Sequence, residues 1–199
     1  MSYGFVIFAI IIIVVGVIES RGTSSFFSFP SIRPDNRGDI DESIAYLKGK
    51  RPKKPGRYVM KESLYERYQK HFYEEDTLSA VARDMLKHLG LPNNSVPVYV
   101  VDDMEGNAAG KFYGSAIEIN IQRYTRPNEV LAVLIHECMH YYMRLTRLGF
   151  SDVQKNEILT DTATIYFGFY DYIYSGYIHV GYIKDSEIRY IKKVLDEKK

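Results

Sequence analysis

The chain of 199 residues has no tryptophan, only one cysteine, and no marked excess of either charge. Because Cys138 has no second cysteine to pair with, an internal disulfide is excluded, which fits a reducing compartment. The net charge is +1, so no global positive field indicates nucleic acid as a partner. The one basic run, over residues 50–54, is more typical of a solvated loop than of a lipid or nucleic-acid patch.

Charge is also absent from residues 1–18, which are apolar without a break from Gly4 onwards. As a helix these residues would span about 27 Å, close to the thickness of the hydrocarbon core of a bilayer. No basic residue precedes the run, and the sequence after it is a poor cleavage site, so an uncleaved anchor is favoured over a signal peptide. Since Arg21, Arg33 and Arg37 all follow it, we expect a single-pass membrane protein whose domain is cytoplasmic.

The rest of the chain divides into a linker and one domain. Residues 19–38 are rich in Ser, Gly, Pro and Arg and lack any helical or strand period, which is typical of a linker. Residues 39–199 are long enough for one compact domain with its own core. Apolar periodicity and capping signals predict helices over 39–47, 61–74, 76–89, 126–148, 151–173 and 185–198. The fourth helix is expected to stop at Gly149, and Ser151 is expected to cap the start of the fifth.

Two strands are expected, over 96–101 and 113–121, with a turn region between them. In the second strand Ile117, Ile119 and Ile121 alternate with polar or small residues, as in an antiparallel strand with one face in the core. The fold class expected is therefore α+β and mostly helical, with a small antiparallel sheet packed on a long helix.

That long helix carries the pattern H-E-x-x-H as His136, Glu137 and His140. Residues four apart share one face of a helix, so both imidazoles can bind one Zn²⁺ while Glu137 lies beside a metal-bound water. Two histidines on a partly buried helix would give the same pattern without a metal, so a third ligand is needed. The metzincin arrangement would place a histidine at position 146, where this chain has Thr146. Cys138 is expected on the other side of the helix, as a small core residue.

The motif "NEILTD", residues 156–161, offers that third ligand. With a turn between positions 149 and 151, His140 lies about 13 Å from the turn and Glu157 about 9 Å from it on the returning helix. His136 and Asp161 lie one helical turn deeper, at about 19 and 15 Å. The spacing therefore predicts that Glu157 completes a His₂Glu ligand set and that Asp161 accepts the other ring N–H of a ligand histidine.

Together, "HECMH" and "NEILTD" resemble the gluzincin metallopeptidases, whose thermolysin-like members carry H-E-x-x-H followed by N-E-x-x-[ST]-D. The resemblance implies a minimal zincin-like domain with one Zn²⁺ per chain, held by His136, His140 and Glu157. It also implies Glu137 as the general base and Asp161 as the residue that orients a ligand histidine.

The resemblance covers residues 113–170 and has two departures. The gap between the second histidine and the glutamate is shorter than in thermolysin, and the chain has no counterpart of the large C-terminal domain that supplies transition-state donors in that group. Tyr166, Tyr170 and His179 are the available candidates for such a donor, and each is also compatible with a place in the core or on the surface.

The function predicted is hydrolysis of a peptide or protein substrate, in which Glu137 takes a proton from a zinc-activated water. The strand 113–121 is expected to offer an edge to an extended peptide, with Ala116, Glu118 and Asn120 as substrate-binding residues. Two other functions fit the same residues. One is a zinc amidase or deacetylase acting on a non-peptide substrate, and the other is a non-catalytic binding module.

Overall fold

The computed structural model describes residues 35–50, 52, 55–104, 108–122, 126–177 and 181–197. In this part of the chain the fold is mostly helical with one small sheet, which confirms the predicted α+β class. The elements are α2 (Arg37–Lys50), α3 (Glu62–His71), α4 (Glu75–His88), β1 (Val98–Val101), β2 (Gly110–Phe112), β3 (Ile117–Asn120), α5 (Pro127–Thr146), α6 (Val153–Tyr166), α7 (Tyr170–Gly176) and α8 (Asp185–Asp196).

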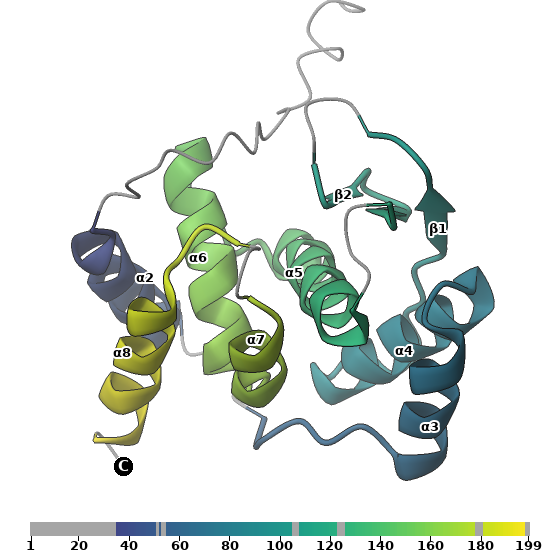
Figure 1. The fold of residues 1–199 in the computed structure, drawn as a ribbon. Helices are drawn as coiled ribbons and strands as arrows, with labels where there is room; N and C mark the ends of the chain where they lie inside the picture. The colour runs from purple at the N-terminus through teal and green to yellow at the C-terminus, as the bar shows by residue number, and fades with distance from the viewer. Residues whose placement is uncertain are drawn as a thin grey trace, which may run out of the picture.

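Helix α5 lies at the centre of the fold, with the sheet on one side and α6 on the other (Figure 1). Helix α4 contacts both α5 and β1, and α3 packs against α4. Helices α2 and α8 cover α6, while α7 contacts both helices of the central pair. This placement explains why α5 is apolar on nearly all sides, since Leu131, Leu134 and Met139 are each at most 1% exposed.

The sheet is mixed, so the antiparallel sheet predicted from the sequence is wrong in part. Its strand order is β1-β3-β2, with β1 parallel to β3 and β2 antiparallel to β3. The difference comes from β2, which lies in the segment assigned to turns. A tight turn, closed by a hydrogen bond of 2.9 Å from Tyr113 N to Ala116 O, folds β2 beside β3. Strand β1 then pairs with the opposite edge of β3, in the parallel direction.

This topology also corrects the predicted role of the strand 113–121. Ile117 and Ile119 are fully buried, as predicted, but β3 is the central strand and both of its edges are paired. Glu118 and Asn120 therefore have no free edge to offer an extended peptide, and Asn120 is itself buried. Ala116 lies in the turn before β3, where its carbonyl oxygen accepts the hydrogen bond from Tyr113 N. Strand β2 is the edge strand on that side of the sheet.

The turn between α5 and α6 begins earlier than predicted. Pro127 stands at the first helical position of α5, but the helix ends at Thr146 and not near position 148. Arg147 takes the left-handed conformation, with a φ of 55°, that a C-terminal glycine was expected to take. On the returning side Asp152, one residue after the predicted Ser151, is the N-cap and accepts a hydrogen bond from Lys155 N.

Helix α6 is shorter than the sequence indicated, since it ends at Tyr166 and α7 begins at Tyr170. Gly168 between them has a φ of +96°, which side chains other than glycine rarely adopt. A Cβ atom on Gly168 would lie 2.2 Å from Gly56 O, so the backbones of two distant segments touch here. The break allows α7 to turn back against α5.

The predicted boundary of the linker is too late, because Asn36 is buried and bonded to the C-terminal part of the domain. Its Nδ2 donates to Tyr182 O at 3.1 Å, and its backbone N–H donates to Glu187 Oε1 at 2.8 Å. Helix α2 then begins at Arg37. These contacts attach the start of the described chain to the segment that precedes α8.

The predicted membrane anchor over residues 1–18 lies outside the described residues. Across 35–197, apart from the gaps named above, no helix combines the length and apolar character needed to cross a bilayer. As far as the chain is described, this finding contradicts the single-pass membrane localisation predicted from the sequence. A membrane anchor is therefore not part of the function that we propose for this protein.

Candidate metal centre

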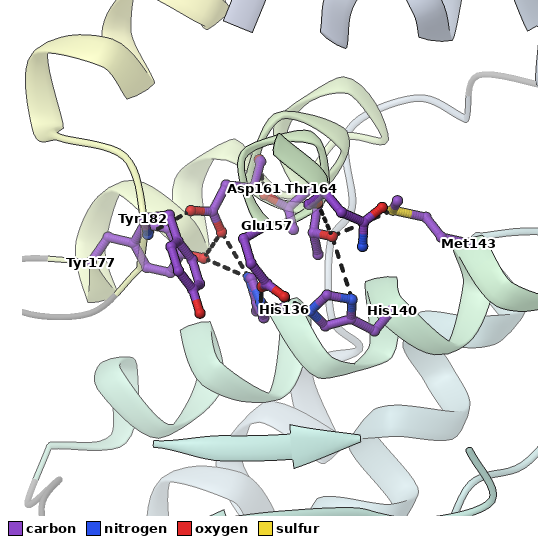
Figure 2. Close-up of polar contacts among 10 residues, drawn as sticks. His136, His140, Met143, Glu157, Asp161, Thr164, Tyr177 and Tyr182 are labelled. Carbon is purple, nitrogen blue, oxygen red and sulfur yellow. Dashed lines mark hydrogen bonds and ion pairs between the residues drawn. The ribbon is translucent and has the colours of Figure 1, made fainter. Parts of the chain in front are cut away.

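Two helices bring the predicted site residues together. Helix α5 presents His136, Glu137 and His140, and the returning α6 presents Glu157 and Asp161 to the same space (Figure 2). The two carboxylates reach from α6 onto the imidazoles below them in this view. The contacts follow the predicted distances from the turn, since Asp161 bonds to His136, the histidine farther from the turn, and not to His140.

Two uncharged side chains, Asn156 and Tyr46, hold the turn between α5 and α6 in place. Asn156 Oδ1 accepts a hydrogen bond of 3.1 Å from Phe150 N, so the asparagine of "NEILTD" fixes the turn. Tyr46 on α2 contacts the same turn, because its hydroxyl accepts a hydrogen bond of 3.1 Å from Gly149 N. The register of the hairpin, and with it the position of Glu157, is therefore set by α2 as well as by the turn.

Three ligand atoms converge at the centre of the site. His136 Nε2 and His140 Nε2 are 2.9 Å apart, and Glu157 Oε2 is 3.1 Å from each of them. His136, His140 and Glu157 form a group in which the ligand atoms all lie within 4.8 Å of one another. Burial of two imidazoles and a carboxylate is costly unless they bind one another or a metal ion.

The donor set fits a tetrahedral zinc ion. Zinc bonds to histidine nitrogen and carboxylate oxygen are about 2.0–2.1 Å long, so two ligand atoms of a tetrahedron lie about 3.3 Å apart. The observed separations of 2.9 and 3.1 Å need to widen by only a few tenths of an ångström. Two histidines and one glutamate also leave a fourth position, as in catalytic zinc sites and unlike closed structural ones.

The other nitrogen of His136 is held by Asp161, which is completely buried. His136 Nδ1 lies 2.7 Å from Asp161 Oδ1, which also accepts a hydrogen bond from the Tyr177 hydroxyl. The second oxygen, Oδ2, accepts the backbone N–H of Tyr182 at 2.8 Å, and the Tyr182 ring stacks on the His136 ring with 6.0 Å between centroids. With Nδ1 bonded in this way, Nε2 points its lone pair at the centre of the site.

The hydrogen bonds among His136, His140, Glu157 and Asp161 also shift the pKa values of His136 and Glu157. Burial of the His136 ring opposes its protonation, but the Asp161 charge and the hydrogen bonds to Asp161 and Glu157 outweigh burial and raise its pKa well above the usual value. Burial likewise favours the neutral form of Glu157, but hydrogen bonds from the two imidazoles lower its pKa to about 2. Glu157 is therefore an anion at neutral pH, as a metal ligand must be.

Glu137 lies beside this group without joining it. Its side chain is buried, and burial raises its pKa, although the two histidines and a hydrogen bond from Phe112 N–H oppose the rise. Gly110 leaves room for it, since a Cβ atom there would lie 3.2 Å from Glu137 Oε1 and 2.6 Å from Val133 Cγ1. A carboxylate with a raised pKa next to a metal site is suited to accept and return a proton.

The contact with Glu137 also shows which edge of the sheet faces the site. On either side of β2, Tyr113 N donates to Ala116 O and Ala109 O accepts from Asn120 N, so the backbone groups of residues 109 and 113 point toward β3. Because ladder groups alternate in direction along an antiparallel strand, the backbone groups of Gly110 and Phe112 point outward. The outer edge of β2 therefore runs along the candidate metal site, whereas the sequence predicted that the neighbouring strand would lie there.

Sequence reasoning missed the two tyrosines that hold Asp161. Tyr177 and Tyr182 belong to a chain with 18 tyrosines, and no spacing marked them. Of the predicted donor candidates, Tyr166 and Tyr170 line a separate pocket of about 720 Å³ at the far end of α6, and His179 lies outside the described residues. Cys138 is buried in the core, as predicted.

Comparison with known proteins gives no match: no family model fits the chain, and no curated protein or solved structure resembles it significantly. The resemblance to gluzincins therefore depends on His136, Glu137, His140, Glu157 and Asp161 alone. A zincin-like fold and a zinc-dependent activity remain predictions.

Proposed function

We propose that this chain is a zinc-dependent metallopeptidase with a zincin-like fold. The observation that carries the proposal is the convergence of His136 Nε2, His140 Nε2 and Glu157 Oε2 within hydrogen-bonding distance of one another, on a hairpin that also places Glu137 beside them. His136, His140 and Glu157 hold the zinc ion. When bound there, zinc supplies the Lewis acidity that makes water a nucleophile near neutral pH and polarises a carbonyl group.

Each protein group has a distinct task in peptide hydrolysis. The Glu137 carboxylate takes a proton from the attacking water, whose oxygen bonds to the carbonyl carbon of the substrate. As the C–N bond breaks, Glu137 returns that proton to the departing nitrogen, so the products are a carboxylate and a free amine after proton exchange with solvent. Asp161 keeps His136 in the tautomer whose Nε2 is free to bind metal.

The outer edge of β2 favours a peptide over other amide substrates. Phe112 N–H already donates to Glu137, so an extended peptide can pair with the other outward backbone groups of Gly110 and Phe112. This pairing places one of its peptide bonds next to the candidate metal site. A zinc amidase or deacetylase would use the same residues on a substrate without an extended backbone. A non-catalytic binding module would have no use for Glu137, whose buried carboxylate is costly to keep.

Metal analysis of the full chain tests the ligand set. The wild type and Glu137→Gln should each bind one zinc ion per chain, whereas Glu157→Ala should lose most of the bound metal because it removes one of three protein ligands. Zinc is measured by mass spectrometry after dialysis against a weak chelator. If Glu157→Ala holds zinc as tightly as the wild type, Glu157 is not the third ligand.

Cleavage of casein and of a mixed peptide library tests the activity. Glu137→Gln should lower the rate by about 10²–10⁴-fold while zinc stays bound, since it removes the proton acceptor alone. Glu66→Gln, the same change at an exposed position on α3, is the matched control and should cleave at the wild-type rate. An unchanged rate in Glu137→Gln would refute the mechanism, and acetylated or amidated small molecules in parallel distinguish the amidase alternative.

A further inference from the structure

Arg144 lies two helical turns beyond Glu137 on the same face of α5. Seven residues turn through about 700° and rise about 10 Å, so the two side chains point in nearly the same direction, toward β2. The Arg144 guanidinium carbon lies 5.9 Å from the centre of the Phe112 ring. A Cβ atom on Gly114 would lie 2.0 Å from Arg144 Nη1, so the guanidinium packs directly on the backbone where β2 ends.

The charge of Arg144 has no acidic partner in the part of the chain that the structure describes. The guanidinium lies instead over an aromatic ring. Some exposed cations of the domain do have acidic partners, since Arg57 pairs with Asp171 at 2.6 Å and Lys155 pairs with Glu42 at 2.7 Å. Lys111 on β2 resembles Arg144, because its Nζ lies 4.7 Å from the centre of the Tyr113 ring. A guanidinium without an acidic partner, at the end of a substrate-binding edge, is suited to bind a carboxylate through two parallel hydrogen bonds.

The distance along α5 from Glu137 to Arg144 determines which residue of a bound peptide would carry that carboxylate. An extended peptide advances about 3.3 Å per residue, so the rise of about 10 Å between Glu137 and Arg144 corresponds to about three residues. Strand β2 runs from Gly110, beside Glu137, to Phe112 and Gly114, beside Arg144. A peptide that pairs in the more stable antiparallel direction then has its N-terminal side at Arg144.

We propose that the site selects peptides with Asp or Glu about three residues before the scissile bond, and that Arg144 binds this acidic side chain. The inference rests on the proposed peptidase function for its position along the substrate, while the binding preference itself is independent of catalysis. Arg144 acts as a specificity-determining residue because it lies at the edge strand and about 10 Å from the reacting groups.

Binding is tested with full-length Glu137→Gln protein loaded with zinc and immobilised. A library of random peptides is passed over it, and the retained peptides are sequenced by mass spectrometry. Peptides with Asp or Glu should be retained about tenfold over those with Asn or Gln at the same position, as expected for a charge-assisted pair. The double variant Glu137→Gln/Arg144→Glu should instead retain peptides with Lys or Arg.

The control is Glu137→Gln/Arg147→Glu, which makes the same charge change at an exposed residue that follows the end of α5. It should keep the preference for acidic peptides. Retention without regard to charge, no retention at all, or a preference that Arg144→Glu leaves unchanged would each overturn the inference.

Cleavage by the wild type separates this inference from the proposed function. If peptides are cleaved without an acidic preference upstream of the cut, Arg144 has no role in specificity and the peptidase assignment stands. If acidic peptides are retained but none is cleaved, the binding inference stands and the peptidase assignment fails.

Discussion

Asp161 Oδ1 and His136 Nδ1 lie 2.7 Å apart, joining two helices across 25 residues of sequence. The carboxylate is completely buried and accepts two more hydrogen bonds, from the Tyr177 hydroxyl and from Tyr182 N. A buried carboxylate with three donors is fixed in position, so it fixes the imidazole in turn. Four segments of the chain thus meet at a single side chain beside the candidate metal site.

Replacing Asp161 should weaken metal binding. We expect Asp161→Asn to lower zinc affinity by about 10–100-fold, because an amide does not stabilise the Nδ1–H tautomer of His136 as a carboxylate does. Competition with a fluorescent zinc chelator measures the change. Asp171→Asn on α7, where the carboxylate pairs with the exposed Arg57, should leave the affinity unchanged. Equal affinities for Asp161→Asn and the wild type would show that Asp161 has no influence on the metal.

Zinc binding should release a proton near neutral pH. The raised pKa of His136 means that its ring keeps a second proton to a higher pH than an ordinary imidazole does, and this proton must leave before Nε2 can bind zinc. Affinity should therefore fall as the pH is lowered and rise as the pH approaches that pKa. Calorimetric titration in buffers of different ionisation enthalpy measures about one proton released. A binding heat that is the same in every buffer would contradict the protonated state.

Gly110 should be required for activity and not for zinc binding. A methyl group at this position meets Val133 Cγ1 and the Glu137 carboxylate, so Gly110→Ala should displace the base. We expect kcat to fall by about tenfold or more with zinc content unchanged, because a shift near 1 Å is enough to disturb proton transfer. Gly38→Ala, which meets no atom within 4 Å, is the control. Full activity in Gly110→Ala would show that Glu137 tolerates this displacement.

Glycine-to-alanine changes at two other positions should have opposite effects on stability. Gly168→Ala should reduce the free energy of unfolding by about 2–4 kcal/mol, since φ is +96° and the methyl group would meet Gly56 O. Gly49→Ala lies in α2 with open space around it and should raise that free energy by up to about 1 kcal/mol. Urea unfolding followed by circular dichroism measures both. A Gly168→Ala protein as stable as the wild type would refute the close contact.

The helices could be predicted from the sequence because apolar periodicity is a strong signal within a single segment. The stripe of Leu78, Val81 and Met85 indicated α4, and all three side chains are fully buried. The ends of the helices were predicted less well, since the residue that caps a helix is chosen among a few neighbouring candidates. Arg147 in the left-handed conformation replaced the expected glycine, and Asp152 replaced Ser151 as N-cap. These differences of one or two residues did not disturb the hairpin.

The sheet was predicted less well because strand pairing is a long-range property. Strand β2 has only three residues, one of them a glycine, and carries no alternation that a sequence pattern can detect. Its pairing with β3 decided that Glu118 and Asn120 are interior to the sheet and that Gly110 and Phe112 form the edge. No local feature of 113–121 contains that information.

The sequence by itself determined which groups share a helix face and at what depth. The i, i+4 spacing of His136 and His140 aligns the imidazoles, and fixed helical rise sets Glu157 opposite them. Only the tertiary structure decided which strand borders the site, which tyrosines hold Asp161, and that Arg144 reaches the end of β2. Spacing along one helix is fixed by covalent geometry, whereas contacts between distant segments depend on how the whole core packs.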